Sequence, residues 1–287
     1  MAFGLVLGAG GPLGWVYHLG VLDGVRRALG HEPAGADRIV GTSAGGAIAA
    51  GLLAGASNEE ILTAVTTRPS EAEMAEMREA AGSLRRPWRW LRPAAPGLAL
   101  RVGGDVGVGA LVGLLPAGVF PTVTLRRFPS DGTAGWPPPL WIPSVAIDDG
   151  RLVVFGRDRT DVTIADAIEA TAAVPAMFKP KRIGDQRFVD GAVRSATNAD
   201  LLIGEGLEVV LISSPMTRPG RGLVRSRARR QLRREADALR AAGTRVVVVE
   251  PDEEILALAE GFPRRNPESG ADIIEAAAIK TAIALAR

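Results

Sequence analysis

The pentapeptide Gly41-Thr42-Ser43-Ala44-Gly45 places a serine midway between two glycines, a spacing typical of an enzymatic nucleophile. It follows the apolar run 38–40 and leads into small residues, which predicts a strand, a sharp turn and a helix. Ser43 would then lie at a helix N-terminus, where free N–H groups favour developing negative charge. Gly41 and Gly45 would leave room for the neighbouring strand and helix. In the alternative interpretation, the turn is only structural and Ser43 caps the helix.

A glycine-rich loop near the N-terminus could bind an anion. Residues 3–7 predict a short buried strand, residues 8–14 are the loop, and a helix is expected from near Trp15. The backbone N–H groups of such a loop can hold a dinucleotide pyrophosphate or the oxyanion of an acyl-transfer intermediate. A dinucleotide-binding fold expects an acidic ribose ligand at the end of the second strand. This chain has Ser43 there instead, which favours the oxyanion hole.

The histidine content restricts which residue could act as the general base. The two histidines, His18 and His31, both precede Ser43. An α/β-hydrolase triad needs a histidine after the serine, so that triad is excluded. His18 is expected to pack within the first helix, and His31 to follow its C-terminal cap or lie in an exposed loop. The base is therefore expected to be a carboxylate or a lysine.

Asp190 is the best candidate for this base. It ends the predicted strand 186–190 and precedes Gly191, although Asp-Gly is also a common hairpin turn. A helix of small and apolar residues, predicted over 164–178 and stopped by a proline, would lie tightly against the sheet or a pocket. A carboxylate is a weaker base than imidazole, and partial burial is expected to raise its pKa for this task.

Taken in order, these three motifs resemble the patatin-like phospholipase family, in a compact bacterial form. The loop, with Ala9 and Gly14, is similar to the oxyanion loop of this family. The segment from Gly41 to Gly45 is similar to its nucleophile elbow, and Asp190-Gly191-Ala192 is similar to its Asp-Gly-Gly/Ala motif. The segment 172–180 is also typical of such proteins, and the resemblance covers about residues 3 to 215. It implies a Ser–Asp dyad, with Ser43 as nucleophile and Asp190 as base. It further implies an acyl-ester hydrolase of lipids that needs no metal or other cofactor.

The glycine loop departs from the family pattern at two positions. The family sequence Gly-Gly-Gly-x-Arg/Lys-Gly is here Ala9-Gly10-Gly11-Pro12-Leu13-Gly14. Ala9 is a mild change if its backbone angles suit alanine, and the N–H groups of Gly10 and Gly11 are the expected oxyanion donors. Leu13 replaces a cation that could meet an anionic head group, which favours a neutral ester or a lysolipid. An acyltransferase, a thioesterase, or a non-catalytic lipid- or nucleotide-binding module stay open as alternatives.

The alternation of strands and helices predicts the fold. Strands are expected at 3–7, 38–42, 142–147, 152–155, 186–190, 207–213 and 244–249. This pattern predicts an α/β fold, a three-layer α/β/α sandwich with a mostly parallel central sheet. We expect a single domain over residues 1–287, with the motifs in about 3–215 and a C-terminal helix–strand–helix unit in 216–287. Nothing in the sequence indicates an oligomeric state.

The sequence predicts a cytoplasmic enzyme with a lipid or fatty-acyl ester substrate. The chain has no cysteine, no basic signal-peptide start and no apolar run of membrane-spanning length. Arginine and tryptophan alternate from Arg85 to Arg92, which would suit peripheral contact with a membrane or a solvated connector. Residues 94–121 could form a lid or the wall of an acyl pocket, or simply pack irregularly.

A second basic stretch runs from Arg218 to Arg245. A helix is predicted over 223–242, with an apolar stripe opposite its arginines. This face could bind an anionic partner, but a solvated helix surface is the favoured interpretation. The net charge is only +2 and no nucleic-acid motif accompanies it, so nucleic-acid binding is not expected. An amphipathic helix over 273–286 is predicted to close the chain.

Overall fold

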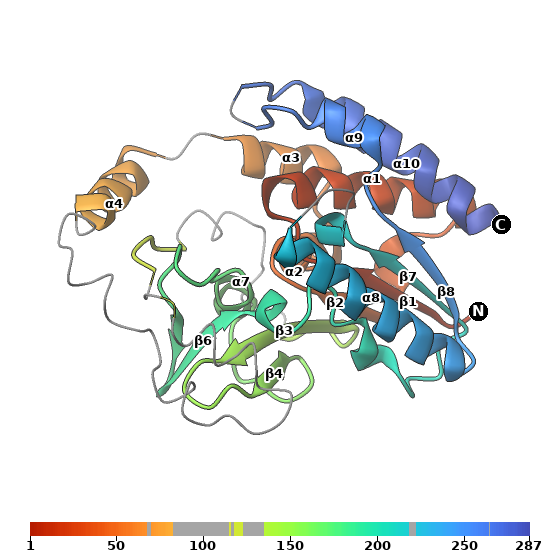
Figure 1. Ribbon diagram of the computed structural model, residues 1–287, viewed down its shortest axis with the longest axis horizontal. Coiled ribbons are helices and arrows are strands. Elements are labelled where there is room, and N and C mark those ends of the chain that lie inside the picture. Colours follow the sequence, from red (N-terminus) through yellow and green to blue (C-terminus); the bar gives the residue numbers. More distant parts are fainter. Residues whose placement is uncertain (68–69, 83–114, 116–117, 123–134, 218–221, 264) are drawn as a thin grey trace.

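The computed structural model describes all residues except 68–69, 83–114, 116–117, 123–134, 218–221 and 264. The described part is an α/β fold on a mixed, mostly parallel sheet of eight strands, in the order β5-β6-β3-β2-β1-β7-β8 with β4 paired to β3 (Figure 1). The strands are β1 (Phe3–Leu7), β2 (Arg38–Gly41), β3 (Leu140–Ala146), β4 (Leu152–Phe155), β5 (Lys181–Ile183), β6 (Gln186–Asp190), β7 (Val209–Ser213) and β8 (Arg245–Val249).

The central strands are parallel and the strands beyond them are not. The five strands β3, β2, β1, β7 and β8 run parallel to their neighbours, whereas β4 and β6 pair antiparallel with β3, and β5 pairs antiparallel with β6. Buried parallel strands are short, nearly continuous apolar runs, which is why the sequence predicts them well. Strand β5 was not predicted, because its three residues are mostly polar and its pairing with β6 is not visible in the sequence.

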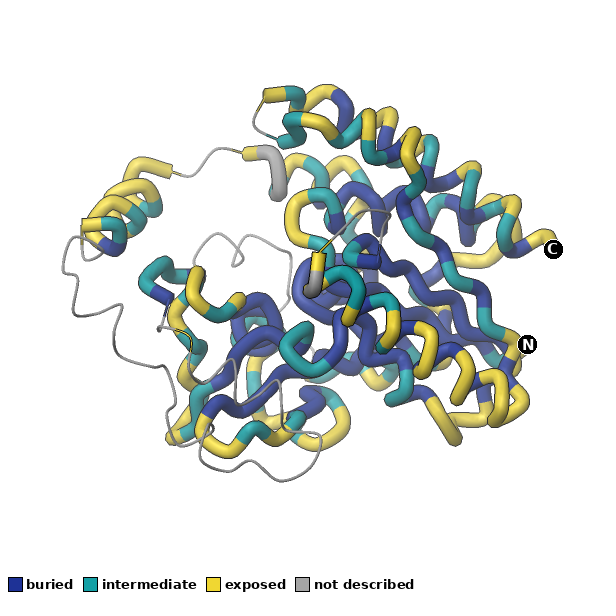
Figure 2. Tube along the Cα trace, viewed as in Figure 1, coloured by how far each residue is buried: buried dark blue, intermediate teal, exposed yellow. Residues whose placement is uncertain are grey.

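Alternate residues of the strands point to opposite faces of the sheet and bury a large core on each face, which makes the fold a three-layer sandwich. Leu5 and Leu7 of β1 contribute to the core under α1 (Gly11–Leu29), α2 (Ala44–Leu53), α7 (Ile164–Thr171) and α10 (Ser269–Ala286). Val6 points to the other face, where α8 (Leu223–Ala241) covers the sheet. Figure 2 shows the buried sheet between these helical layers. The predicted fold class is therefore confirmed.

The C-terminal segment is packed into the same structure. Strand β8 pairs with β7, and α10 crosses α1 closely: a Cβ on Gly20 would lie 2.3 Å from the Ile274 carbonyl oxygen, and one on Gly24 would lie 2.5 Å from the Thr281 side chain. The remaining α-helices in the described part of the chain are α3 (Asn58–Thr66), α4 (Glu71–Gly82) and α9 (Glu253–Leu258). Since α1 begins at the glycine loop, α10 braces the helix that carries this loop.

Three predicted helix boundaries are wrong. Helix α10 begins at Ser269 rather than at residue 273, and proline accounts for the other two. Helix α1 begins at Gly11 rather than near Trp15, because Pro12 has the fixed φ angle that suits a first helical turn. Helix α7 ends at Thr171 rather than continuing to residue 178. The proline at 175 disfavours helical angles at the preceding residue, so the chain leaves the helix before it.

The two basic stretches are described to different extents. Residues 85–92 lie outside the described residues, as do 218–221 and most of 94–121. Helix α8 is amphipathic as predicted, with Leu232, Ala236 and Leu239 buried and five exposed arginines on its outer side. These arginines are Arg227, Arg230, Arg233, Arg234 and Arg240. No described helix is long and apolar enough to cross a bilayer.

Candidate active site

Ser43 lies on a strained turn between β2 and α2. Its backbone has φ 55° and ψ −119°, and its positive φ is one of three at non-glycine residues in the described part of the chain. Its side chain is buried but makes no capping hydrogen bond to α2. The interpretation of Ser43 as a simple helix cap is therefore wrong. Such strain persists only where the surroundings enforce it, and it is concentrated at functional sites.

The glycines on either side of Ser43 are required by packing. A Cβ on Gly45 would lie 1.9 Å from the carbonyl oxygen of Leu7 in β1, and one on Gly41 would lie 2.7 Å from the carbonyl oxygen of Gly45. Both distances are far too short for a real Cβ. The elbow therefore presses α2 against the sheet, as the pentapeptide predicts.

Asp190 ends β6 and lies beside Ser43. It is 3% exposed, pairs in register with Ser144 of β3, and its Oδ1 accepts a 2.8 Å hydrogen bond from the Ala192 N–H. A short 3₁₀ turn follows it, not a hairpin. Burial raises the pKa of its carboxyl to about 7, although the hydrogen bonds from Ala192 and the Ser43 side chain act in the opposite direction. A carboxyl with this pKa can exchange a proton near neutral pH.

The end of α7 holds both members of this pair. The Thr171 hydroxyl accepts a 3.0 Å hydrogen bond from the Ser43 N–H and donates a 2.6 Å bond to the Pro143 carbonyl of β3. The Ala173 carbonyl accepts a 3.1 Å bond from the Asp190 N–H. This role could not be predicted from the sequence, since Thr171 is 128 residues from Ser43 and only the fold brings them together.

Removing the Thr171 hydroxyl is expected to disturb the elbow. Thr171→Val keeps the shape but leaves the buried Ser43 N–H and Pro143 carbonyl without this partner, a loss of about 1–3 kcal/mol in the free energy of unfolding. We also expect at least a tenfold fall in kcat, because the nucleophile loses a backbone anchor. Thr171→Ser keeps the hydroxyl and should preserve kcat within about threefold. Thermal melts and ester turnover of both variants test this, and equal kcat in the two would contradict it.

The glycine loop leaves the sheet beside the elbow. Strands β1 and β2 are parallel neighbours, and the Thr42 N–H donates a 2.9 Å bond to the Leu7 carbonyl. Gly14 contacts the start of α2, since a Cβ there would lie 3.2 Å from the Ala44 Cβ. Gly10 is the N-cap of α1, and Gly11, which has φ 57°, is the first residue of this helix.

The N–H groups of this loop are available to an anion. Among the described residues, neither the Gly10 nor the Gly11 N–H has a hydrogen-bond acceptor, as expected at the start of a helix. Ala9 is buried, and its N–H donates a 2.7 Å bond to the Ala196 carbonyl. Its φ is not positive, so alanine fits this position. Leu13 is partly buried, and its apolar side chain packs against the main core.

His18 is a packed helix residue, as predicted, and it also supports the loop. It is buried, with Nε2 2.7 Å from the Gly8 carbonyl and Nδ1 2.8 Å from the Ser213 hydroxyl. Burial lowers the pKa of His18 to about 4, against the effect of the Gly8 bond. The neutral ring must then donate from Nε2, because a carbonyl can only accept, and Nδ1 accepts from Ser213. His31 is exposed, directly after the C-cap Gly30.

A buried polar network contacts the elbow at Thr42. The Asn198 side-chain amide donates to the Thr42 hydroxyl at 3.1 Å and to the Ser195 carbonyl at 2.7 Å. Glu235 of α8 is buried and accepts hydrogen bonds from the Thr197 hydroxyl and the Ala199 N–H. Burial raises the pKa of Glu235. This network holds the segment that contains Ala196, whose carbonyl accepts the bond from the Ala9 N–H of the glycine loop.

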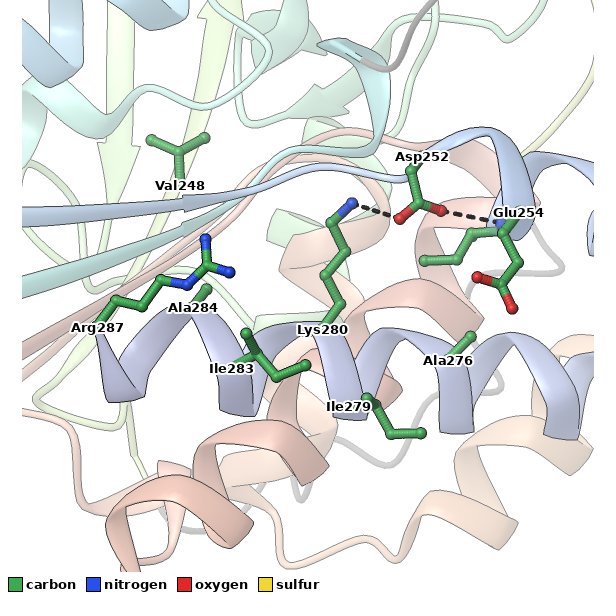
Figure 3. A pocket seen from close by; sticks show the side chains of 10 residues that line it. Val248, Asp252, Glu254, Ala276, Ile279, Lys280, Ile283, Ala284 and Arg287 are labelled. Atoms are coloured by element: carbon green, nitrogen blue, oxygen red, sulfur yellow. Dashed lines mark hydrogen bonds and ion pairs between the residues drawn. The ribbon is translucent and has the colours of Figure 1, made fainter.

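A groove of about 510 Å³ lies elsewhere, between β8, α9 and α10 (Figure 3). Its rim includes Ile279 and Ile283 of α10, and Lys280 forms a 2.6 Å ion pair with Asp252 across it. Neither Ser43 nor Asp190 lines it. The described residues contain no cluster of three or more His, Asp or Glu side chains suited to a metal ion.

Comparison with known proteins found a family model and solved structures similar to this chain. The family model described as patatin-like phospholipase matches residues 5–203. The structure of VipD from Legionella pneumophila superposes with a TM-score of 0.50 at 12% identity, over 99% of this chain and 66% of VipD. The type III effector protein ExoU gives a TM-score of 0.44 at 18% identity, over 99% of this chain and 53% of ExoU. A search of curated protein sequences found no match.

The fold and the family match define the class of the protein. It belongs to the patatin-like phospholipase family, as its three motifs predict. Membership implies lipid acyl hydrolase chemistry carried out by a serine hydrolase. The chain spans about two thirds of VipD and about half of ExoU, and at 12% identity the likeness to VipD concerns the fold alone.

Proposed function

We propose that this protein hydrolyses acyl esters of lipids through a dyad of Ser43 and Asp190. The observation that carries the proposal is the contact between these two side chains: a buried carboxyl, hydrogen-bonded to a strained serine, with its pKa raised to about 7. A general base with this pKa is poised to take the serine proton near neutral pH. The family membership supports the same chemistry.

The proposed reaction begins with the formation of an acyl-enzyme. The Asp190 carboxylate takes the hydroxyl proton as Ser43 Oγ attacks the ester carbonyl carbon. The N–H groups of Gly10 and Gly11 stabilise the oxyanion, and the loss of one such donor typically costs about 3 kcal/mol in the barrier. The tetrahedral intermediate then expels the alcohol, which takes the proton from Asp190, and leaves an acyl-enzyme.

Water completes the cycle in a second half-reaction. Asp190 takes a proton from the water as its oxygen attacks the acyl carbonyl carbon. The ester bond to Ser43 breaks, Ser43 Oγ recovers the proton, and the fatty acid leaves. Leu13 in the loop offers no cation for a phosphate group, so we propose neutral esters or lysolipids as the preferred substrates.

Labelling with a fluorophosphonate probe tests the nucleophile. The probe should label the folded wild type, because it reacts covalently with activated serines. Ser43→Ala should abolish the labelling, whereas the control Ser226→Ala on α8 should keep it. Labelled protein is read by gel fluorescence and by the mass of the modified peptide. Folded wild type that takes no label, or labelling that survives Ser43→Ala, would overturn the proposal.

A further inference from the structure

An exposed apolar turn follows α7, formed by residues 174 to 177. Val174 is 38% exposed and Met177 is 51% exposed, so two large apolar side chains face solvent within four residues of the chain. Between them, Ala176 has φ 65°, a strained value for a residue with a side chain. The turn therefore presents two apolar side chains to solvent at a cost in local strain, which is a feature typical of functional segments.

The turn begins at the residues that hold the dyad. The Thr171 hydroxyl binds the Ser43 N–H at 3.0 Å, and the Ala173 carbonyl binds the Asp190 N–H at 3.1 Å. Val174 is the next residue, and successive Cα atoms are about 3.8 Å apart. The exposed side chains thus lie where the chain leaves the site.

Hydrogen bonds fix the backbone of this turn. The N–H groups of Met177 and Phe178 both donate to the Val174 carbonyl, at 3.2 and 2.9 Å. The Met177 carbonyl accepts two further bonds, from Val119 at 3.2 Å and from Phe120 at 3.1 Å. These bonds hold the backbone of the turn in the conformation that leaves the two apolar side chains exposed.

We propose that Val174 and Met177 form the binding site for the acyl chain of the substrate. The proposal rests on the function proposed above, since an ester bound at Ser43 has its acyl chain next to the reacting carbonyl. Covering these side chains with methylene groups removes apolar surface from water, which favours a fatty acyl chain over a short polar one. The flexible thioether of Met177 suits chains of differing shape.

Chain-length selectivity provides the first test. We compare kcat/KM for p-nitrophenyl octanoate with that for the acetate, in the wild type and in Val174→Ser/Met177→Ser. The double variant should lower the octanoate-to-acetate ratio about tenfold, because each buried methylene contributes roughly 0.8 kcal/mol. Thermal melts and circular dichroism confirm that the variant is folded.

A matched control separates this site from general surface apolarity. Ile279 and Ile283 of α10 are 49% and 51% exposed and lie on the rim of the distant groove (Figure 3). Ile279→Ser/Ile283→Ser should leave the ratio unchanged. An unchanged ratio in the turn variant would overturn the proposal. This includes the case in which kcat/KM falls equally for both esters, because a residue that only positions Asp190 affects all esters alike.

A binding measurement tests the turn without catalysis. Ser43→Ala protein is titrated with dansyl-labelled undecanoic acid, and the same titration is made with the turn substitutions added. We expect the Kd to rise about tenfold with Val174→Ser/Met177→Ser and to stay unchanged with the α10 control. Equal affinity in all three proteins would overturn the proposal. Because this readout needs no turnover, failure of the dyad hypothesis and failure of the acyl-chain site are distinguishable.

Discussion

Replacing Asp190 with asparagine is expected to lower kcat for an ester by at least about a thousandfold and, at pH 8, to make the protein more stable. The amide cannot accept the Ser43 proton, and the loss of the base in such a unit removes most of the catalysis. Asn keeps an oxygen for the 2.8 Å bond from the Ala192 N–H, so the site should keep its shape. The measurement is turnover of p-nitrophenyl butyrate beside a thermal melt of each protein.

The gain in stability follows from the pKa of the carboxyl. Burial raises the pKa of Asp190 from 3.8 to about 7 in the folded protein. Below about pH 4 the carboxyl is protonated in both states and has no effect. As the pH rises from 4 to 7, the unfolded chain releases this proton while the folded protein keeps it, so the free energy of unfolding falls. Above pH 7 the destabilisation is complete, and the shift corresponds to about 4 kcal/mol at most.

The two effects of this substitution therefore differ in their dependence on pH. The stability advantage of Asp190→Asn should be largest at pH 8 and should shrink as the pH falls toward 4. In the wild type, kcat/KM should rise with pH through about 7, as the carboxyl ionises to become the base. Asp185→Asn, at a fully exposed carboxyl, is the matched control and should change neither property. Near-normal turnover in Asp190→Asn would show that another group is the base.

The residues of the site were predictable where local sequence carries a steric or chemical requirement. The elbow glycines, the glycine loop and the Asp-Gly pair are such cases, because a sharp turn or a free N–H group needs a particular residue at a particular spacing. The apolar strands of the parallel sheet were predictable for a similar reason, since burial on both faces leaves a continuous apolar run. These features are local, so one sequence suffices to read them.

The features that the sequence did not show depend on contacts between distant segments. Thr171 is an ordinary residue at the end of a small-residue helix, and only the fold brings its hydroxyl to the Ser43 N–H. The raised pKa of Asp190 comes first from burial, which the packing of β6 against β3 and α7 creates. His18 was correctly placed in the packed helix, but its bonds to Gly8 and Ser213 depend on the neighbouring strand ends.

Replacing Gly45 with alanine is expected to unfold or strongly destabilise the protein. The added Cβ would lie 1.9 Å from the Leu7 carbonyl oxygen and 2.8 Å from the Leu7 Cβ. Leu7 belongs to β1, a central strand with neighbours on both sides, so neither it nor α2 can move without breaking the sheet or displacing Ser43. Overpacking against backbone should cost at least about 3 kcal/mol. A thermal melt should show a midpoint lower by about 10 °C or no folded protein.

Gly51→Ala on the same helix is the matched control. Its Cβ would lie 3.2 Å from the end of the Ile61 side chain, which can shift, and alanine is the better helix former, so the stability should change by less than about 1 kcal/mol. A Gly45→Ala protein that melts with the wild type would contradict the close β1–α2 contact. The comparison separates two properties of one pentapeptide. Its serine supplies the proposed chemistry, whereas its glycines let the helix approach the sheet closely enough to hold that serine in a strained conformation.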